Sequence, residues 1–108
     1  MITKTEKTFT ARIYMSGPIE TAKQVCRRLC HAQGLCVTVD PTLLIYTGGE
    51  ETGFVVGLIN YPRFPADERG IEGRAFEMAH ALLAETYQHS ALIVTPEKTT
   101  WITTRATP

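Results

Sequence analysis

Three cysteines and one histidine lie close together in the sequence and have side chains that bind metals or act as nucleophiles: Cys26, Cys30, His31 and Cys36. Their spacing, C-x3-C-H-x4-C, differs from the spacings of known zinc sites. Cys26 and Cys30 also fall on the apolar stripe of a predicted helix, where free cysteine packs as a small hydrophobic residue. We therefore interpret the cysteines as core thiols and predict no metal site and no cofactor.

No pattern predicts a catalytic group. His31 and His89 lie at the ends of predicted helices and His80 lies on the second of them, so the sequence does not bring a histidine beside a nucleophile and an acid. Paired carboxylates occur only at residues 50–51 and 67–68, where they are typical of solvated turn charges. We predict no catalytic residue.

A loop arginine gives the better candidate for ligand binding. Arg63 is followed by Phe64, and Arg69 is nearby, so guanidinium groups could bind a carboxylate or phosphate. Backbone N–H groups after Gly17, at the start of a predicted helix, would add donors for an anion. The alternative is that these arginines are ordinary solvated charges.

The elements that must position these residues are organised around residues 35–62, which read as a long hairpin. Two apolar runs flank a turn that contains Gly48, Gly49 and Gly53. Strict alternation predicts a strand at 8–15, and Pro41 predicts a bulge or an edge position within the hairpin. The remaining elements follow from apolar periodicity: a helix from 16–20 to Gly34, a loop at 62–70, a second helix from residue 71, a strand at 91–95 and an extra edge strand or arm at 99–104.

This order predicts an α+β, ferredoxin-like β-α-β-β-α-β sandwich. Applying the right-handed crossover rule twice gives an antiparallel sheet with both helices on one face and an extra C-terminal edge strand. We expect one domain over residues 1–108, with residues 1–7 frayed. Tyr14, Val55, Ile59 and Tyr61 are expected on the uncovered face, where an apolar surface usually marks an interface. We therefore expect a homo-oligomer, either a dimer or a trimer.

Composition limits the function classes. The chain has 108 residues, of which 44% are apolar, and its 11 basic and 11 acidic residues cancel. A neutral chain lacks the field that attracts nucleic acid or acidic membranes, so nucleic-acid and membrane partners are disfavoured. An odd number of cysteines and the lack of a secretory segment or a membrane-length apolar run favour the cytoplasm.

Two resemblances to known families rest on short segments. Residues 13–15 and 53–56 resemble the two signatures of the RNA-recognition motif, with Tyr14 at the position of a base-stacking aromatic, although Thr52 and Val56 replace its basic and second aromatic residues. The resemblance implies RNA binding on the open sheet face. Residues 13–19 are similar to the strand-to-helix opening of nucleoside deoxyribosyltransferases, a short match without further support.

A longer resemblance covers most of the chain. Residues 36–37 after the first helix, Ile45 and Tyr46 before a Gly-Gly-Glu turn, and Trp101 in the terminal segment resemble the CutA proteins, which are related in architecture to PII signalling proteins. The resemblance implies a trimer with hairpins that cross subunits, and an association with metal tolerance. It implies no particular functional residue.

These observations lead to one functional interpretation and two alternatives. We expect a small non-enzymatic homo-oligomeric module that binds a partner protein or a small anionic ligand, with Arg63, Phe64, Arg69, Gly17 and Tyr14 as candidate binding residues. The alternatives are a small enzyme with an anion pocket near Arg63, and RNA binding on the open face.

Overall fold

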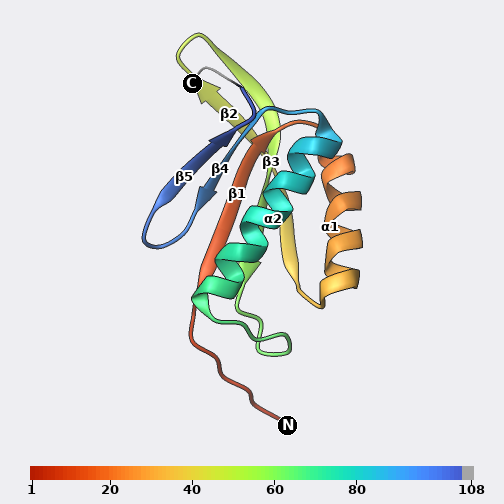
Figure 1. The fold of residues 1–108 in the computed structure, drawn as a ribbon, viewed down its shortest axis with the longest axis vertical. Coiled ribbons are helices and arrows are strands. Elements are labelled where there is room, and N and C mark those ends of the chain that lie inside the picture. The colour runs from red at the N-terminus through yellow and green to blue at the C-terminus, as the bar shows by residue number, and fades with distance from the viewer. Residues whose placement is uncertain (106–108) are drawn as a thin grey trace.

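The computed structural model describes residues 1–105 and contains five strands and two helices (Figure 1). Their order along the chain is β1 (Thr10–Ser16), α1 (Ile19–Gln33), β2 (Val37–Tyr46), β3 (Gly49–Ile59), α2 (Glu68–Thr86), β4 (Ser90–Val94) and β5 (Thr99–Thr103). Residues 1–9 precede the first strand and contain no helix or strand.

The strands form one antiparallel sheet in the order β2-β3-β1-β4-β5, and both helices lie side by side on the same face (Figure 1). Each helix connects two strands that have a third strand between them, which is the ferredoxin-like connectivity. β5 extends the sheet beyond β4. The predicted fold class, the single-sided helix layer and the extra C-terminal edge strand are therefore confirmed.

The core lies between the helices and the middle of the sheet. Alternate residues of β1 and β3 face the helices, and Ile13, Met15, Phe54 and Val56 have almost no exposed surface. The two helices are also linked by an ion pair between Arg28 and Glu85, whose hydrogen bond lowers the pKa of the Glu85 carboxyl group.

The start of one helix differs from its expected position. α2 begins at Glu68, earlier than expected, because the Asp67 side chain accepts a hydrogen bond from the Gly70 N–H at 2.7 Å. The charges at 67–68 are thus part of a helix start and not of a free turn. In α1, Pro18 occupies the N-cap position and no side chain caps the helix, which begins at Ile19.

The β2–β3 hairpin is longer than the rest of the sheet. β2 passes Pro41 without a bulge, since every residue from Val37 to Tyr46 has one partner on β3, and the proline is tolerated because β2 is an edge strand. β1 pairs with β3 only from Gly53 onward, so residues 43–52 project as a two-stranded ribbon (Figure 1). Ile45 on this ribbon is 73% exposed.

The uncovered face of the sheet carries most of the side chains expected there. Val55 is half-buried and Ile59 is exposed, while their neighbours Phe54 and Leu58 are buried against the helices. Tyr61 was expected on the same face, but β3 ends at Ile59 and the Tyr61 ring packs against the loop that follows. Neither helix in residues 1–105 has the length and apolarity required to span a membrane.

Gly53 is required where β1 and β3 meet. A Cβ atom at this position would collide with the carbonyl oxygen of Met15 and approach the Cα atom of Ser16 to 2.8 Å. We therefore expect Gly53→Ala to lower the free energy of unfolding by about 1–3 kcal/mol in urea denaturation, because backbone cannot move aside as a side chain does.

Gly73→Ala is the matched control, since a Cβ atom there has nothing within 4 Å and the residue lies inside α2. It should raise the free energy of unfolding by about 0.5–1 kcal/mol. Equal stability of the two variants would show that the close approach at Gly53 does not constrain the sheet.

Candidate active site on the uncovered sheet face

An apolar row crosses the uncovered face of the sheet. Strand register places Val55 beside Tyr14, Tyr14 beside Leu92, and Leu92 beside Trp101, so one side chain from each of four adjacent strands contributes. Asp40 of β2 pairs with Val55 and ends the row with a carboxylate. Leu92 and Trp101 remain 37% and 49% exposed, so this row leaves apolar side chains exposed on the open face.

Two adjoining hollows lie where this row meets the base of the hairpin, and we call them together the hairpin-base site. The first, of about 220 Å³, is on the open face between Tyr14, Trp101 and the hairpin residues Leu44 and Glu51. The second, of about 420 Å³, lies at the end of β1 between the hairpin and the segment after α2. The residues that line them are Tyr14, Met15, Ser16, Gly17, Leu44, Glu50, Glu51, Thr52, Gln88, Ser90, Ala91, Leu92 and Trp101.

The backbone near Gly17 brings three elements together at this site. Gly17 has a φ of 128°, which turns the chain from β1 towards α1, and its N–H donates to the Thr52 carbonyl at 3.2 Å. The Ser16 hydroxyl donates to Gln88 Oε1 at 3.0 Å. Gln88 follows the C-cap residue Tyr87, whose left-handed conformation ends α2 at Thr86 and turns the chain.

The charge of the hairpin-base site is negative. Glu50 and Glu51 are the only charged residues that line its two hollows, and neither carboxylate forms an ion pair within residues 1–105. Glu51 lines both hollows. A site with free carboxylates beside aromatic rings favours a cationic ligand with a flat apolar part.

The structure separates the five residues that the sequence singled out. Arg63 and Phe64 stay together, in a groove between α1 and the loop after β3, and Arg69 lies near the start of α2. Tyr14 is part of the hairpin-base site. The Gly17 N–H is already bonded to Thr52, and the hollow beside it is lined by carboxylates, which is an unfavourable place for an anion.

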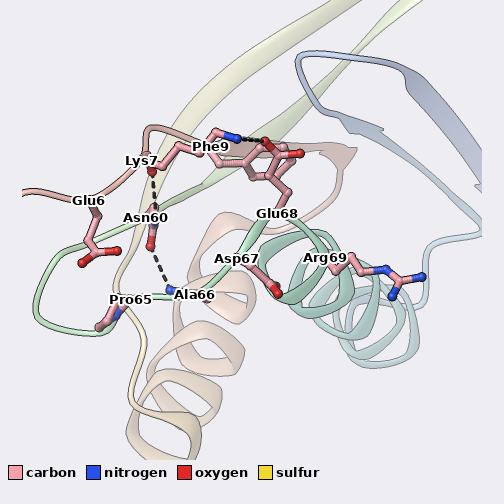
Figure 2. A pocket seen from close by; sticks show the side chains of 9 residues that line it. All are labelled: Glu6, Lys7, Phe9, Asn60, Pro65, Ala66, Asp67, Glu68 and Arg69. Carbon is pink, nitrogen blue, oxygen red and sulfur yellow. Dashed lines mark hydrogen bonds and ion pairs between the residues drawn. The ribbon is translucent and has the colours of Figure 1, made fainter.

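A hollow of about 530 Å³ near Arg69 has a structural explanation (Figure 2). Asn60 accepts a hydrogen bond from the Ala66 N–H at 2.9 Å and donates to the Lys7 carbonyl at 2.8 Å, and Lys7 pairs with Glu68 at 3.3 Å. The Arg69 guanidinium points away from these residues. The polar groups therefore tie the N-terminal segment to the start of α2.

The three cysteines are free and lie near one another. Burial, with the neighbouring Cys30 as a second cause, raises the pKa of the Cys26 thiol to about 11. Burial also raises the pKa of Cys30, with Cys36 as a second cause. These shifts keep the two thiols protonated near neutral pH, which disfavours thiolate chemistry. Within residues 1–105, no three His, Cys, Asp or Glu side chains are placed to hold one metal ion.

Glu51, Gln88 and Trp101 were missed as site residues. The sequence showed Glu51 as one of two turn charges and Trp101 as part of an edge strand, and it gave no signal for Gln88. The available signal was the alternation of β3, which continues into the hairpin and places Glu51 on the same face as Val55.

The chain is similar to a phage S-adenosylmethionine (SAM) lyase in its apo state, with a TM-score of 0.69 and 16% identity over 93% of this chain and 92% of the other. It is also similar to a phage SAM lyase in complex with S-methyl-5'-thioadenosine, with a TM-score of 0.66 and 14% identity over 100% of this chain and 98% of the other. No protein-family model and no curated protein matches the chain.

These matches correct the functional interpretation. At 14–16% identity these matches show the shared fold, and they extend over nearly the full length of both neighbours. Each neighbour is a SAM lyase, which is an enzyme. The expectation of a non-enzymatic binding module, and with it the expectation that the chain is not an enzyme, is contradicted. The alternative of a small enzyme agrees better with the matches.

The raised pKa of Cys26 predicts a loss of stability at high pH. The folded-state pKa of about 11 lies above the ordinary value of 9.0, so the folded protein holds this proton more tightly than the unfolded chain. The resulting stabilisation is complete below about pH 9 and disappears as the pH rises through about 11. A shift of about two pKa units corresponds to roughly 2–3 kcal/mol in the free energy of unfolding.

Urea denaturation of the native chain and of Cys26→Ala, at about pH 8 and about pH 11, measures this difference. Lysine and tyrosine titrate in both proteins, so the difference between their pH dependences isolates Cys26. Parallel pH dependences would contradict the assignment.

Proposed function

We propose that this chain is an enzyme that binds a sulfonium nucleoside such as SAM at the hairpin-base site and cleaves one of its carbon–sulfur bonds. The observation that carries the proposal is the pairing of free carboxylates with an aromatic row, on a fold that matches SAM lyase structures over nearly the whole chain. The bound S-methyl-5'-thioadenosine of one neighbour is the neutral thioether that remains when such a bond is broken.

The side chains of the site match the parts of this substrate. The Glu51 carboxylate would attract the sulfonium or the amino group, and the Tyr14 and Trp101 rings offer flat surfaces for adenine. Gln88 uses its Oε1 atom to accept from Ser16, which leaves its amide N–H groups to donate to a neutral acceptor of the substrate, such as a ribose hydroxyl or an adenine ring nitrogen.

The reaction itself favours apolar walls. When the carbon–sulfur bond breaks, its electron pair passes to sulfur and the positive charge of the sulfonium disappears. The carbon that loses sulfur gains a new bond, either from the substrate's own carboxylate, which gives a lactone, or from the electron pair of a neighbouring C–H bond whose proton leaves, which gives an alkene. A transition state with less charge than the ground state is favoured where water is excluded, as it would be beside Tyr14, Leu92 and Trp101. Glu51 stabilises the charged substrate at least as strongly as the transition state, so its role is binding and not acceleration of the chemical step.

We also propose that the chain forms a homo-oligomer, a dimer or a trimer, through the uncovered sheet face and the hairpin ribbon. Leu43, Ile45, Leu92 and Trp101 expose apolar surface that a second copy would cover. The hollow on the open face holds about 220 Å³, which is below the roughly 300–1,000 Å³ of most small-molecule sites. A second copy on this face would close the site and exclude water. The trimer implied by the CutA resemblance remains a prediction.

The cytoplasm is the proposed location. All three cysteines are free, and the buried Cys26 contacts Met78 as part of the core. Free thiols of this kind are typical of proteins kept in a reducing compartment.

Replacement of Glu51 by glutamine tests the proposed binding role. Glu51→Gln removes the charge and keeps the shape, so it should weaken SAM binding and raise the KM for SAM cleavage by about tenfold, with a smaller effect on kcat. Affinity for the neutral S-methyl-5'-thioadenosine should change little. Calorimetry and chromatographic detection of the thioether product measure these quantities.

Glu97→Gln is the matched control, because Glu97 is exposed in the turn between β4 and β5 and its replacement changes the net charge equally. Trp101→Ala should weaken the binding of both SAM and S-methyl-5'-thioadenosine, because stacking on the indole ring does not depend on the charge of the ligand. If purified chain neither binds SAM nor releases S-methyl-5'-thioadenosine from it, the proposed function is wrong. If Glu51→Gln instead lost most of its kcat with an unchanged KM, the result would indicate that Glu51 accepts a proton in the reaction.

A charge on the uncovered face tests the proposed oligomer. Leu92→Glu places a carboxylate within the apolar row at an exposed position, so the chain should remain folded and sediment as a monomer at micromolar concentration. Gln24→Glu adds the same charge on the exposed side of α1 and should leave the oligomer intact. A monomeric native chain would contradict the proposal directly.

A further inference from the structure

A second site candidate lies on the helix side of the sheet, away from the hairpin-base site. It is a groove of about 480 Å³ between α1, the β2 edge strand and the loop after β3. Its volume lies within the usual range for small-molecule sites. We call it the α1–β2 groove.

The floor of the groove is apolar. Val37 and Val39 of β2 face α1 and are half-buried, and Cys26 and Cys30 of α1 lie opposite them. Since burial raises the pKa of both thiols, they stay neutral and behave as small hydrophobic groups. The floor therefore suits a hydrocarbon or aromatic body.

The rim of the groove is positive. Lys23, Arg27 and Arg63 line it, and no acidic residue does. Lys23 pairs with Glu20 at 3.0 Å, but neither arginine forms an ion pair within residues 1–105. Two free guanidinium groups above an apolar floor complement a carboxylate, sulfonate or phosphate attached to an apolar body.

The loop that carries Arg63 is held in place by local contacts. The Phe64 N–H donates to the Tyr61 carbonyl at 2.8 Å, and the two rings pack with centroids 6.0 Å apart. The Arg63 guanidinium carbon lies 5.6 Å from the centre of the Phe64 ring, a cation–π contact between two residues that line the groove. The groove is thus formed before any ligand binds.

We infer that the α1–β2 groove binds an organic anion with an apolar body, of the chemical class of medium-chain fatty acids. The inference is independent of the proposed function, because it concerns other residues and the opposite charge. A positive rim repels a sulfonium, so the two sites would not share a ligand. The sequence pointed to Arg63 and Phe64, and the fold adds Arg27 from α1 and the apolar floor.

Octanoate is a suitable probe, with 1-octanol as its uncharged counterpart. Titration of the full chain followed by amide NMR should show saturable octanoate binding, with shifts concentrated in residues 23–39 and 61–64. Arg27→Ala and Arg63→Ala should each weaken octanoate binding by about fivefold to tenfold, the effect expected for one charge-assisted hydrogen bond at a partly exposed site. 1-Octanol should bind more weakly and respond little to either substitution.

Arg69→Ala is the matched control, since Arg69 belongs to the following loop and helix start but not to the groove. It should leave octanoate affinity unchanged. If Arg69→Ala weakened octanoate binding as much as the groove variants, the loss would be an effect of net charge alone, and the inference would be overturned. No saturable binding, or shifts confined to β1, β4 and β5, would overturn it as well, and neither result would affect the SAM experiment.

Discussion

The fold depends on a single constraint, the burial of one face of the β1–β3 pair under two helices. Ile13, Met15 and Phe54 are fully buried at this contact, and Gly53 lets the two backbones approach closely. Two helices are enough to cover one face of a five-stranded sheet and leave none to cover the other. The uncovered face, and with it the apolar row beside the hairpin-base site, follows from this one-sided arrangement.

The register of the strands determines which side chains lie at the hairpin-base site. Because side chains alternate along a strand, the pairing that buries Phe54 and Val56 also fixes Val55 and Glu51 on the opposite face. A shift of one residue would exchange the two faces and move the Glu51 carboxylate away from Tyr14 and Trp101. The same core packing that stabilises the fold therefore holds Glu51 beside Tyr14 and Trp101.

The sequence predicted the features that depend on local periodicity. Alternation in β1, the apolar stripe of α1 and the two-sided hydrophobicity of β3 were sufficient for the fold class. Features that depend on pairing between distant segments were not predictable: Trp101 joins Tyr14 only through β4, and Arg27 joins Arg63 only when α1 packs on β2. Asp67 and Tyr61 show that even local features can escape prediction from the sequence. The start of α2 depends on one hydrogen bond to Asp67, and the end of β3 is followed by one ring contact of Tyr61, and composition specifies neither.

The chain has no net charge, yet the two candidate sites carry opposite charge. The hairpin-base site contains carboxylates without basic neighbours, and the α1–β2 groove contains guanidinium groups without acidic neighbours. Salt screens charges beyond about 8–10 Å at physiological ionic strength, so a ligand responds to the local group and not to the sum over the chain. A neutral composition therefore excludes long-range attraction to polyanions but leaves room for two sites of opposite sign, each selective for a small ligand of the complementary charge.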